Sequence, residues 1–160
     1  MPKNIASLFS GCGGLDLGFS GGFVFRNTVC ERLDTNIVFA NDFDRDAWAC
    51  YNNNELLTND GVHSRLGDIR EIPTNEIPNF DILLAGFPCQ PFSNAGNRKG
   101  VHDDNGRGTL FEECERIIRE KIEVGHRPEA FLFENVRGIL SSKMQDGVTT
   151  VPDEDRKSVV

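Results

Sequence analysis

Residues that could react or bind a ligand lie at the ends of short apolar segments in this sequence. Five such groups follow apolar runs along the chain: residues 10–14, Asp42-Phe43, Asp68-Ile69, Pro88-Cys89 and Glu134-Asn135. If the apolar runs are strands of one open parallel sheet, their carboxyl ends lie at the same edge, where ligands of such sheets bind. These groups are therefore the candidate functional residues.

Residues 10–14 and Asp42 together favour a nucleoside cofactor. A glycine-rich turn lets the backbone approach a ligand closely, and an acid at the end of the second strand can accept hydrogen bonds from both ribose hydroxyls. The turn lacks the full G-x-G-x-x-G spacing, and Asp42 lies farther from the glycines than the roughly 20 residues usual in dinucleotide-binding folds. Taken alone, the glycine-rich turn could be a tight connection that binds no ligand, and Asp42 could be an acid that only caps a helix.

Cys89 and Glu134 are the candidate reactive side chains. Cys89 lies in a proline-flanked turn ahead of residues 93–106, a polar stretch predicted to be an exposed, mobile loop. A thiol there can act as a nucleophile if neighbouring donors or a helix N-terminus lower its pKa, and the alternative is an inert packed thiol. Glu134 ends an apolar run, where a carboxylate must be hydrogen-bonded, act as an acid or tie loops together.

The elements that must position these residues alternate along the chain. Strands are predicted at residues 5–9, 37–40, 62–66, 80–86 and 130–133, and helices after residue 14, around residues 47–51 and at residues 110–124. Residues 26–35 are polar and mixed and receive no element. This order predicts an α/β fold, a Rossmann-like, open, mostly parallel sheet with helices on both faces.

Composition restricts the class of protein. The 160 residues suffice for one domain, and the net charge of −8 opposes non-specific attraction to phosphate backbones, so any contact with nucleic acid must be local. No apolar run reaches the about 18 residues of a membrane span, and residues 1–10 lack a secretory layout, so a cytoplasmic protein without membrane contact is expected. Five cysteines without CxxC spacing or nearby histidines predict neither disulfides nor a metal site.

Four motifs, in order, resemble those of DNA cytosine-5 methyltransferases of bacterial restriction–modification systems. The similarity spans about residues 5–140 and lies in Leu8-Phe9-Ser10-Gly11-Cys12-Gly13-Gly14, Gly86-Phe87-Pro88-Cys89-Gln90-Pro91-Phe92-Ser93, Arg107-Gly108-Thr109-Leu110-Phe111 and Glu134-Asn135-Val136. Ser7 departs from the many members that carry Asp before Leu-Phe, and little effect is expected from it.

The resemblance implies S-adenosyl-L-methionine as the cofactor. Carried over position by position, it places Phe9, Gly11, Cys12, Gly13 and Gly14 around the methionine end. Asp42 would bind the ribose hydroxyls and Phe43 would pack on the adenine. Asp68 would accept from the adenine amino group with Ile69 alongside, and Pro88 and Leu110 would line the same pocket.

The resemblance also implies a mechanism on double-stranded DNA. The Cys89 thiolate would add to C6 of a flipped-out cytosine, and Glu134 would protonate or hydrogen-bond N3 while C5 takes the methyl group. Asn135 would hold the local turn, and residues 93–106 would close over the base.

The domain organisation expected from the family is a partial one. Residues 1–140 would form the cofactor-binding and catalytic domain, and residues 141–160 a linker or truncated tail, so that the sheet is incomplete at its C-terminal end. A target-recognition domain is not found in the sequence. A fragment, or one subunit of a split enzyme that needs a complementing C-terminal subunit, is therefore expected.

Three alternatives stay open at this stage. The first is a catalytically silent S-adenosylmethionine-binding fragment or subunit, and the second is the tRNA-modifying branch of the same family. A nicotinamide dehydrogenase fits the fold class alone and leaves Cys89 and Glu134 without a role.

Overall fold

A computed structural model describes residues 1–58, 61–88 and 110–135 of the chain. The chain divides into two compact units, and each is described by itself. The first comprises Met1–Gly86 and Glu113–Phe133, and the second Phe87–Glu112 and Glu134–Val160. The predicted loop at residues 93–106, Cys89 and the tail at residues 141–160 lie outside the described residues.

The first unit is built on a five-stranded parallel sheet with the order β5-β4-β1-β6-β7. The strands are β1 (Lys3–Leu8), β4 (Thr35–Asp42), β5 (Arg65–Leu66), β6 (Ile82–Ala85) and β7 (Ala130–Phe133). Strand β1 is central and pairs with β4 on one side and with β6 on the other, with an irregularity in the β1–β4 register between Ile5 and Ala6. The predicted Rossmann-like parallel sheet is confirmed.

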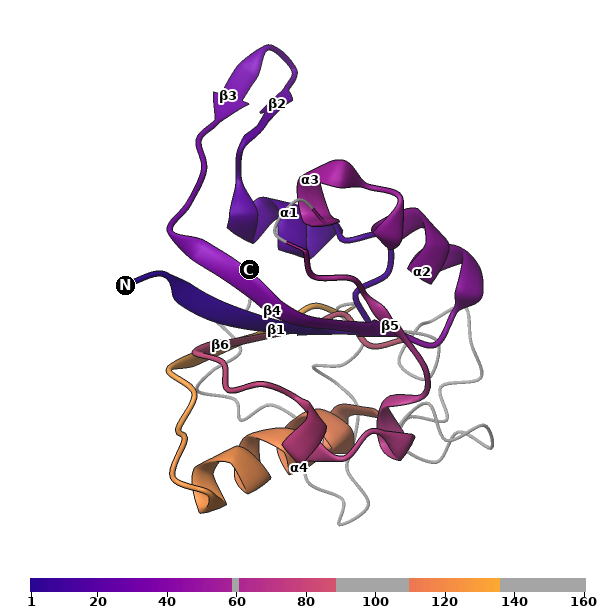
Figure 1. Ribbon diagram of the computed structural model, residues 1–160, viewed down its shortest axis with the longest axis vertical. Coiled ribbons are helices and arrows are strands. Elements are labelled where there is room, and N and C mark those ends of the chain that lie inside the picture. Colours follow the sequence, from indigo (N-terminus) through magenta and orange to yellow (C-terminus); the bar gives the residue numbers. More distant parts are fainter. Residues whose placement is uncertain (59–60, 89–109, 136–160) are drawn as a thin grey trace. The chain divides into compact units, whose positions relative to one another are not determined.

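Helices cover both faces of this sheet, as predicted (Figure 1). On one face lie α1 (Gly14–Ser20), α2 (Arg45–Asn52) and α3 (Glu55–Thr58), and on the other lies α4 (Leu110–Glu123). The Asp44 carboxylate begins α2 by accepting hydrogen bonds from the backbone N–H groups of Asp46 and Ala47. Two short 3₁₀ turns, η1 (Ile69–Glu71) and η2 (Thr74–Glu76), connect β5 to β6.

The apolar residues of the strands form the core beneath the first group of helices. Its buried members are Ile5, Ile37, Ala40, Tyr51, Leu57 and Leu84. On α4, Cys114 and Ile117 are fully buried.

Three features differ from the sequence predictions. Residues 26–35, predicted to lack an element, contribute to a hairpin of β2 (Phe23–Phe25) and β3 (Thr28–Cys30) that projects beyond α1 (Figure 1). Its two-residue turn, Arg26-Asn27, has positive φ at both positions, a geometry that suits the twist of a hairpin. Strand β5 has two residues instead of the predicted five, because only Arg65 and Leu66 pair with β4.

Strand β7 is the third difference, since the apolar run at residues 130–133 predicted a buried strand. Among the described residues it lies at the edge of the sheet and pairs with β6, and Phe131 is 62% exposed. The rings of Phe131 and Phe133 stack on each other with centroids 5.1 Å apart.

Among the described residues, no helix is long and apolar enough to cross a membrane.

Candidate functional site

The glycine-rich turn joins the carboxyl end of β1 to α1, as its sequence predicted. Its backbone is fixed by hydrogen bonds from Ser10 N to Asn41 O at 2.9 Å and from Gly13 N to Ser10 O at 2.8 Å. Gly13 has a φ of 83°, and a Cβ there would overlap the Leu57 side chain. Gly11 also has positive φ, but a Cβ there would meet no atom within 4 Å. Position 13 therefore needs glycine for packing, while the backbone at Gly11 borders open space.

Asp42 connects this turn to the end of the neighbouring strand. Its Oδ2 accepts a hydrogen bond from the Gly11 N–H at 2.8 Å, and its Oδ1 accepts one from the Asp44 N–H at 2.9 Å. The side chain is fixed on both sides, and the residue is only 7% exposed. Because a carboxylate has about four lone-pair sites, each oxygen retains capacity to accept from a hydroxyl. The structure thus brings together two of the predicted site features, Gly11 and Asp42.

Phe43 follows Asp42 directly and is 63% exposed. A large apolar ring at the end of a strand gains nothing from water contact, and it offers a flat surface on which a planar ring can stack. Asp42 and Phe43 therefore present, side by side along the chain, an acceptor for hydroxyl groups and a stacking surface.

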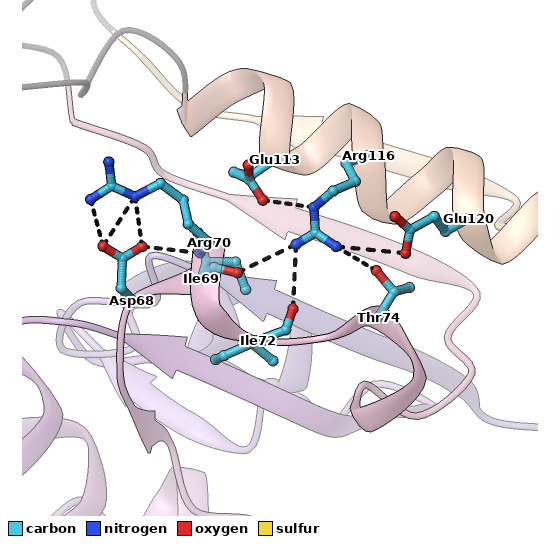
Figure 2. A network of polar contacts seen from close by, with 8 residues as sticks. All are labelled: Asp68, Ile69, Arg70, Ile72, Thr74, Glu113, Arg116 and Glu120. Carbon is cyan, nitrogen blue, oxygen red and sulfur yellow. Dashed lines mark hydrogen bonds and ion pairs between the residues drawn. The ribbon is translucent and has the colours of Figure 1, made fainter.

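Asp68 lies in the turn after β5, and the structure gives it a partner that sequence reasoning missed. Its carboxylate accepts two hydrogen bonds from Arg70 Nε, at 2.9 and 3.1 Å, and pairs with Arg70 Nη2 at 2.5 Å (Figure 2). It also caps η1 by accepting from the Arg70 N–H at 3.0 Å. The guanidinium lowers the pKa of Asp68, so the carboxylate stays ionised and can only accept hydrogen bonds. Ile69, predicted to lie alongside the adenine, is buried.

The side chains of Asn41 and Trp48 hold β5 and the residues on either side of it. The Asn41 side chain donates to Arg65 O at 3.0 Å and to Gly67 O at 2.9 Å. Trp48 Nε1 donates to Ser64 O at 2.7 Å, so this indole has a polar role. The available signal was Asn41 itself, a polar residue that ends an otherwise apolar strand segment.

A second carboxyl group, which sequence reasoning did not single out, lies beneath the glycine-rich turn. Asp16 in the first turn of α1 is fully buried, and its Oδ2 accepts a hydrogen bond from the Ser7 hydroxyl at 2.9 Å. Burial raises the pKa of Asp16 to about 6, against the opposing effect of the Ser7 hydroxyl. Burial, and after it the nearby Asp16 carboxylate, raises the pKa of Tyr51.

Cys12 is exposed in the glycine-rich turn. Its thiol interacts with that of Cys50 on α2, and this contact, with some desolvation, raises the pKa of Cys12. A raised pKa keeps the thiol protonated at neutral pH, which suits a residue that contributes backbone to a binding turn and not a nucleophile. Among the described residues, no group of His, Cys, Asp or Glu side chains could hold a metal ion.

Five of the predicted residues belong to the second unit: Pro88, Cys89, Leu110, Glu134 and Asn135. Asn135 Nδ2 donates a hydrogen bond to Phe87 O at 2.8 Å, which ties the segment after β7 to the segment after β6. The rings of Phe87 and Phe111 meet edge to face with centroids 5.8 Å apart. Glu134 is exposed, so burial does not constrain its carboxylate as the sequence suggested. Pro88 and Leu110 are described, and Cys89 lies outside the described residues.

A family model described as C-5 cytosine-specific DNA methylase matches residues 3–153. The chain is 41% identical to the Type II methyltransferase M.BanI of Aneurinibacillus aneurinilyticus over 88% of its own length and 28% of the relative. It is 38% identical to the Type II methyltransferase M.NgoPII of Neisseria gonorrhoeae over 92% of its length and 37% of the relative. The chain thus spans about a third of the length of the curated relatives that it matches.

The fold is similar to that of a solved structure. The crystal structure of the Dnmt2 methyltransferase of S. pombe superposes with a TM-score of 0.60 at 22% identity, covering 89% of this chain and 37% of that one. At this level of identity the likeness concerns the fold, and it agrees with the parallel sheet described above.

Proposed function

The chain belongs to the C-5 cytosine-specific DNA methylase family, and from that premise we propose that it forms part of an enzyme of a bacterial restriction–modification system. The enzyme would transfer a methyl group from S-adenosyl-L-methionine to C5 of a cytosine in double-stranded DNA. The proposal takes its reaction class from the family and from relatives named Type II methyltransferases. The observation in the structure that supports it best is the hydrogen bond from the Gly11 N–H to the Asp42 carboxylate.

The described residues fit the proposed cofactor. Asp42 would accept the ribose hydroxyls, and the exposed ring of Phe43 would pack on the adenine. Asp68 would accept from the adenine amino group, and the open space at Gly11 leaves room for the methionine end beside Phe9, Cys12, Gly13 and Gly14. Ile69, Pro88 and Leu110 would complete the pocket. When bound, the cofactor supplies an activated methyl group on its sulfonium.

Cys89 and Glu134 would act on the cytosine, which must leave the duplex stack to reach them. The Cys89 thiolate would form a bond to C6, and the displaced electron pair would make C5 nucleophilic toward the methyl group. Glu134 would protonate or hydrogen-bond N3 and stabilise this adduct. Loss of the C5 proton to a base would then restore the C5–C6 double bond and expel Cys89. The bond from Asn135 to Phe87 O supports the role of Asn135 in holding the local turn.

The remaining expectations become part of the proposal. We assign residues 1–140 to the cofactor-binding and catalytic part and residues 141–160 to a linker or tail. Target recognition would come from sequence corresponding to the rest of the relatives' length, in the same polypeptide or in a complementing C-terminal subunit. A cytoplasmic location follows from the substrate.

Titration calorimetry with S-adenosylhomocysteine tests the cofactor part of this proposal. Binding by the 160-residue chain should weaken at least about tenfold in Asp42→Asn and more in Asp42→Ala, because each hydrogen bond to a charged group contributes about 1.5–3 kcal/mol. Asp46→Ala, an exposed acid on α2, is the control and should bind as the native chain does. Thermal unfolding of each variant separates lost binding from lost folding.

Methyl transfer to DNA tests the catalytic part. The chain, supplied with a complementing C-terminal segment, should produce 5-methylcytosine, and Cys89→Ser should abolish the product without weakening S-adenosylhomocysteine binding. Cofactor binding without any methyl transfer in the complemented protein would support the silent-subunit alternative. Absence of cofactor binding by the folded chain would refute the proposal.

A further inference from the structure

The short turn that carries Asp68 and Ile69 lacks the support that a strand would give it. Strand β5 ends at Leu66, and η1 begins at Ile69. The first end of the turn is held by Asp68, which accepts from the Arg70 N–H. At its other end the Ile69 carbonyl accepts a hydrogen bond from the Ile72 N–H at 3.2 Å. The carbonyl groups of Ile69 and Ile72 lie outside the sheet ladder, and such groups need donors when they are shielded from water.

Arg116 of α4 supplies these donors (Figure 2). Its Nη2 donates to Ile69 O at 3.4 Å and to Ile72 O at 3.3 Å, and its Nη1 donates to the Thr74 hydroxyl at 2.9 Å. One side chain of a distant helix therefore contacts three successive points of the segment that follows Asp68.

The Arg116 guanidinium is itself held in place by two carboxylates of its own helix. Glu113 accepts from Nε at 2.8 Å, and Glu120 lies 3.6 Å from Nη1. These partners fix the plane of the guanidinium and balance its charge. A planar group with five N–H donors in a fixed fork can serve several acceptors at once, whereas the lysine ammonium carries its three donors on one atom at the end of a flexible stem.

We propose that Arg116 is a positioning residue, which holds the turn at Asp68 and Ile69 in the orientation that recognises the adenine amino group of the cofactor. This inference rests on the proposed function and deepens it by assigning specificity for the base to a residue that touches neither the base nor the methyl group. Arg116 acts through the backbone of Ile69 and Ile72, and Asp68 makes the contact.

Lys121 provides a matched control on the same helix. Its Nζ donates to Ile77 O at 2.5 Å and to Asn79 Oδ1 at 3.2 Å. It thus anchors the same connection between β5 and β6, but at a point eight residues beyond Ile69. Loss of Lys121 should loosen α4 and lower stability without changing the turn at Asp68.

The test compares two ligands, S-adenosylhomocysteine and S-inosylhomocysteine, in which an oxygen replaces the amino group of the base. Calorimetric titration of the full 160-residue chain gives the ratio of the two dissociation constants. The native chain should prefer the adenine ligand. In Arg116→Met this preference should fall about tenfold or more, because loss of one well-placed hydrogen bond to a charged group changes a dissociation constant by about that factor. Arg116→Lys should give an intermediate ratio, and Lys121→Met should keep the native ratio while melting at a lower temperature.

The outcomes separate this inference from the proposed function. A native chain that binds neither ligand refutes the proposed function, and this inference with it. If the native chain prefers the adenine ligand and Arg116→Met shows the same preference, the positioning role alone is overturned. The positioning role is also overturned if Lys121→Met loses as much of this preference as Arg116→Met does. If Arg116→Met does not fold, Arg116→Lys decides, because an unchanged ratio in that folded variant also overturns the role.

Discussion

Replacement of Asp16 by asparagine should remove a pH dependence from the stability of the fold. Asp16 is fully buried, and burial raises its pKa from 3.8 to about 6. A difference of about two pKa units corresponds to a differential stabilisation of about 3 kcal/mol between the two protonation states. Asparagine has nearly the same shape and does not titrate, so Asp16→Asn isolates this contribution.

The sign of this pH dependence follows from which state, folded or unfolded, binds the Asp16 proton more tightly. The folded chain holds the Asp16 proton up to about pH 6, while the unfolded chain releases it near pH 3.8. The free energy of unfolding therefore falls as the pH rises through this window. The contribution is complete below about pH 4 and is lost, by about 3 kcal/mol, once the pH exceeds the folded pKa.

Urea denaturation followed by the fluorescence of Trp48, the single tryptophan, measures this effect. The free energy of unfolding of Asp16→Asn minus that of the native chain should increase by about 3 kcal/mol between about pH 4 and pH 7. The subtraction cancels other titrations, including that of Asp68, whose lowered pKa acts in the opposite direction.

Ser20→Ala, a buried residue on the same helix without a titrating group, is the control, and its difference from the native chain should be constant with pH. A constant difference for Asp16→Asn as well, or one that shrinks with rising pH, would refute the assignment of a buried, proton-binding carboxyl at this position.

Three further predictions concern the support of the site. Gly13→Ala should lower the free energy of unfolding by roughly 1–3 kcal/mol, since a Cβ overlaps Leu57 and φ is positive, and urea denaturation checks it. Trp48→Phe should cost about 1 kcal/mol through the lost bond to Ser64 O. Because this variant lacks the fluorescent probe, its urea denaturation is followed by far-ultraviolet circular dichroism, and an unchanged midpoint would contradict the prediction. Cys114, whose pKa burial raises to about 12, should resist iodoacetamide at about pH 8 until urea unfolds the chain, as peptide mass mapping would show.

The strands that were predicted well are β1, β4, β6 and β7, each of which carries a predominantly apolar run. Residues 5–9, 37–40 and 80–86 fall on β1, β4 and β6, because continuous apolar runs are required of strands covered on both faces. The hairpin of β2 and β3 carries exposed Val24, Phe25 and Val29, so its apolar pattern marks no core face and gives no such signal. Strand β7 has the composition of a buried strand at an edge position, and its place in the sheet depends on the fold of the whole unit.

Sequence alone determined the order of the five strands of the parallel sheet and of α1, α2 and α4, the family motifs and the positions of the glycine-rich turn, Asp42 and Asp68. These features are local, because a turn needs glycine where φ is positive, and a strand ends where polar residues replace apolar ones. Tertiary structure alone decided the partners: Gly11 for Asp42, Ser7 for Asp16 and Arg116 for the turn after Asp68. These contacts join residues from 9 to 47 positions apart, and only the packing of strands and helices brings their atoms within hydrogen-bonding distance.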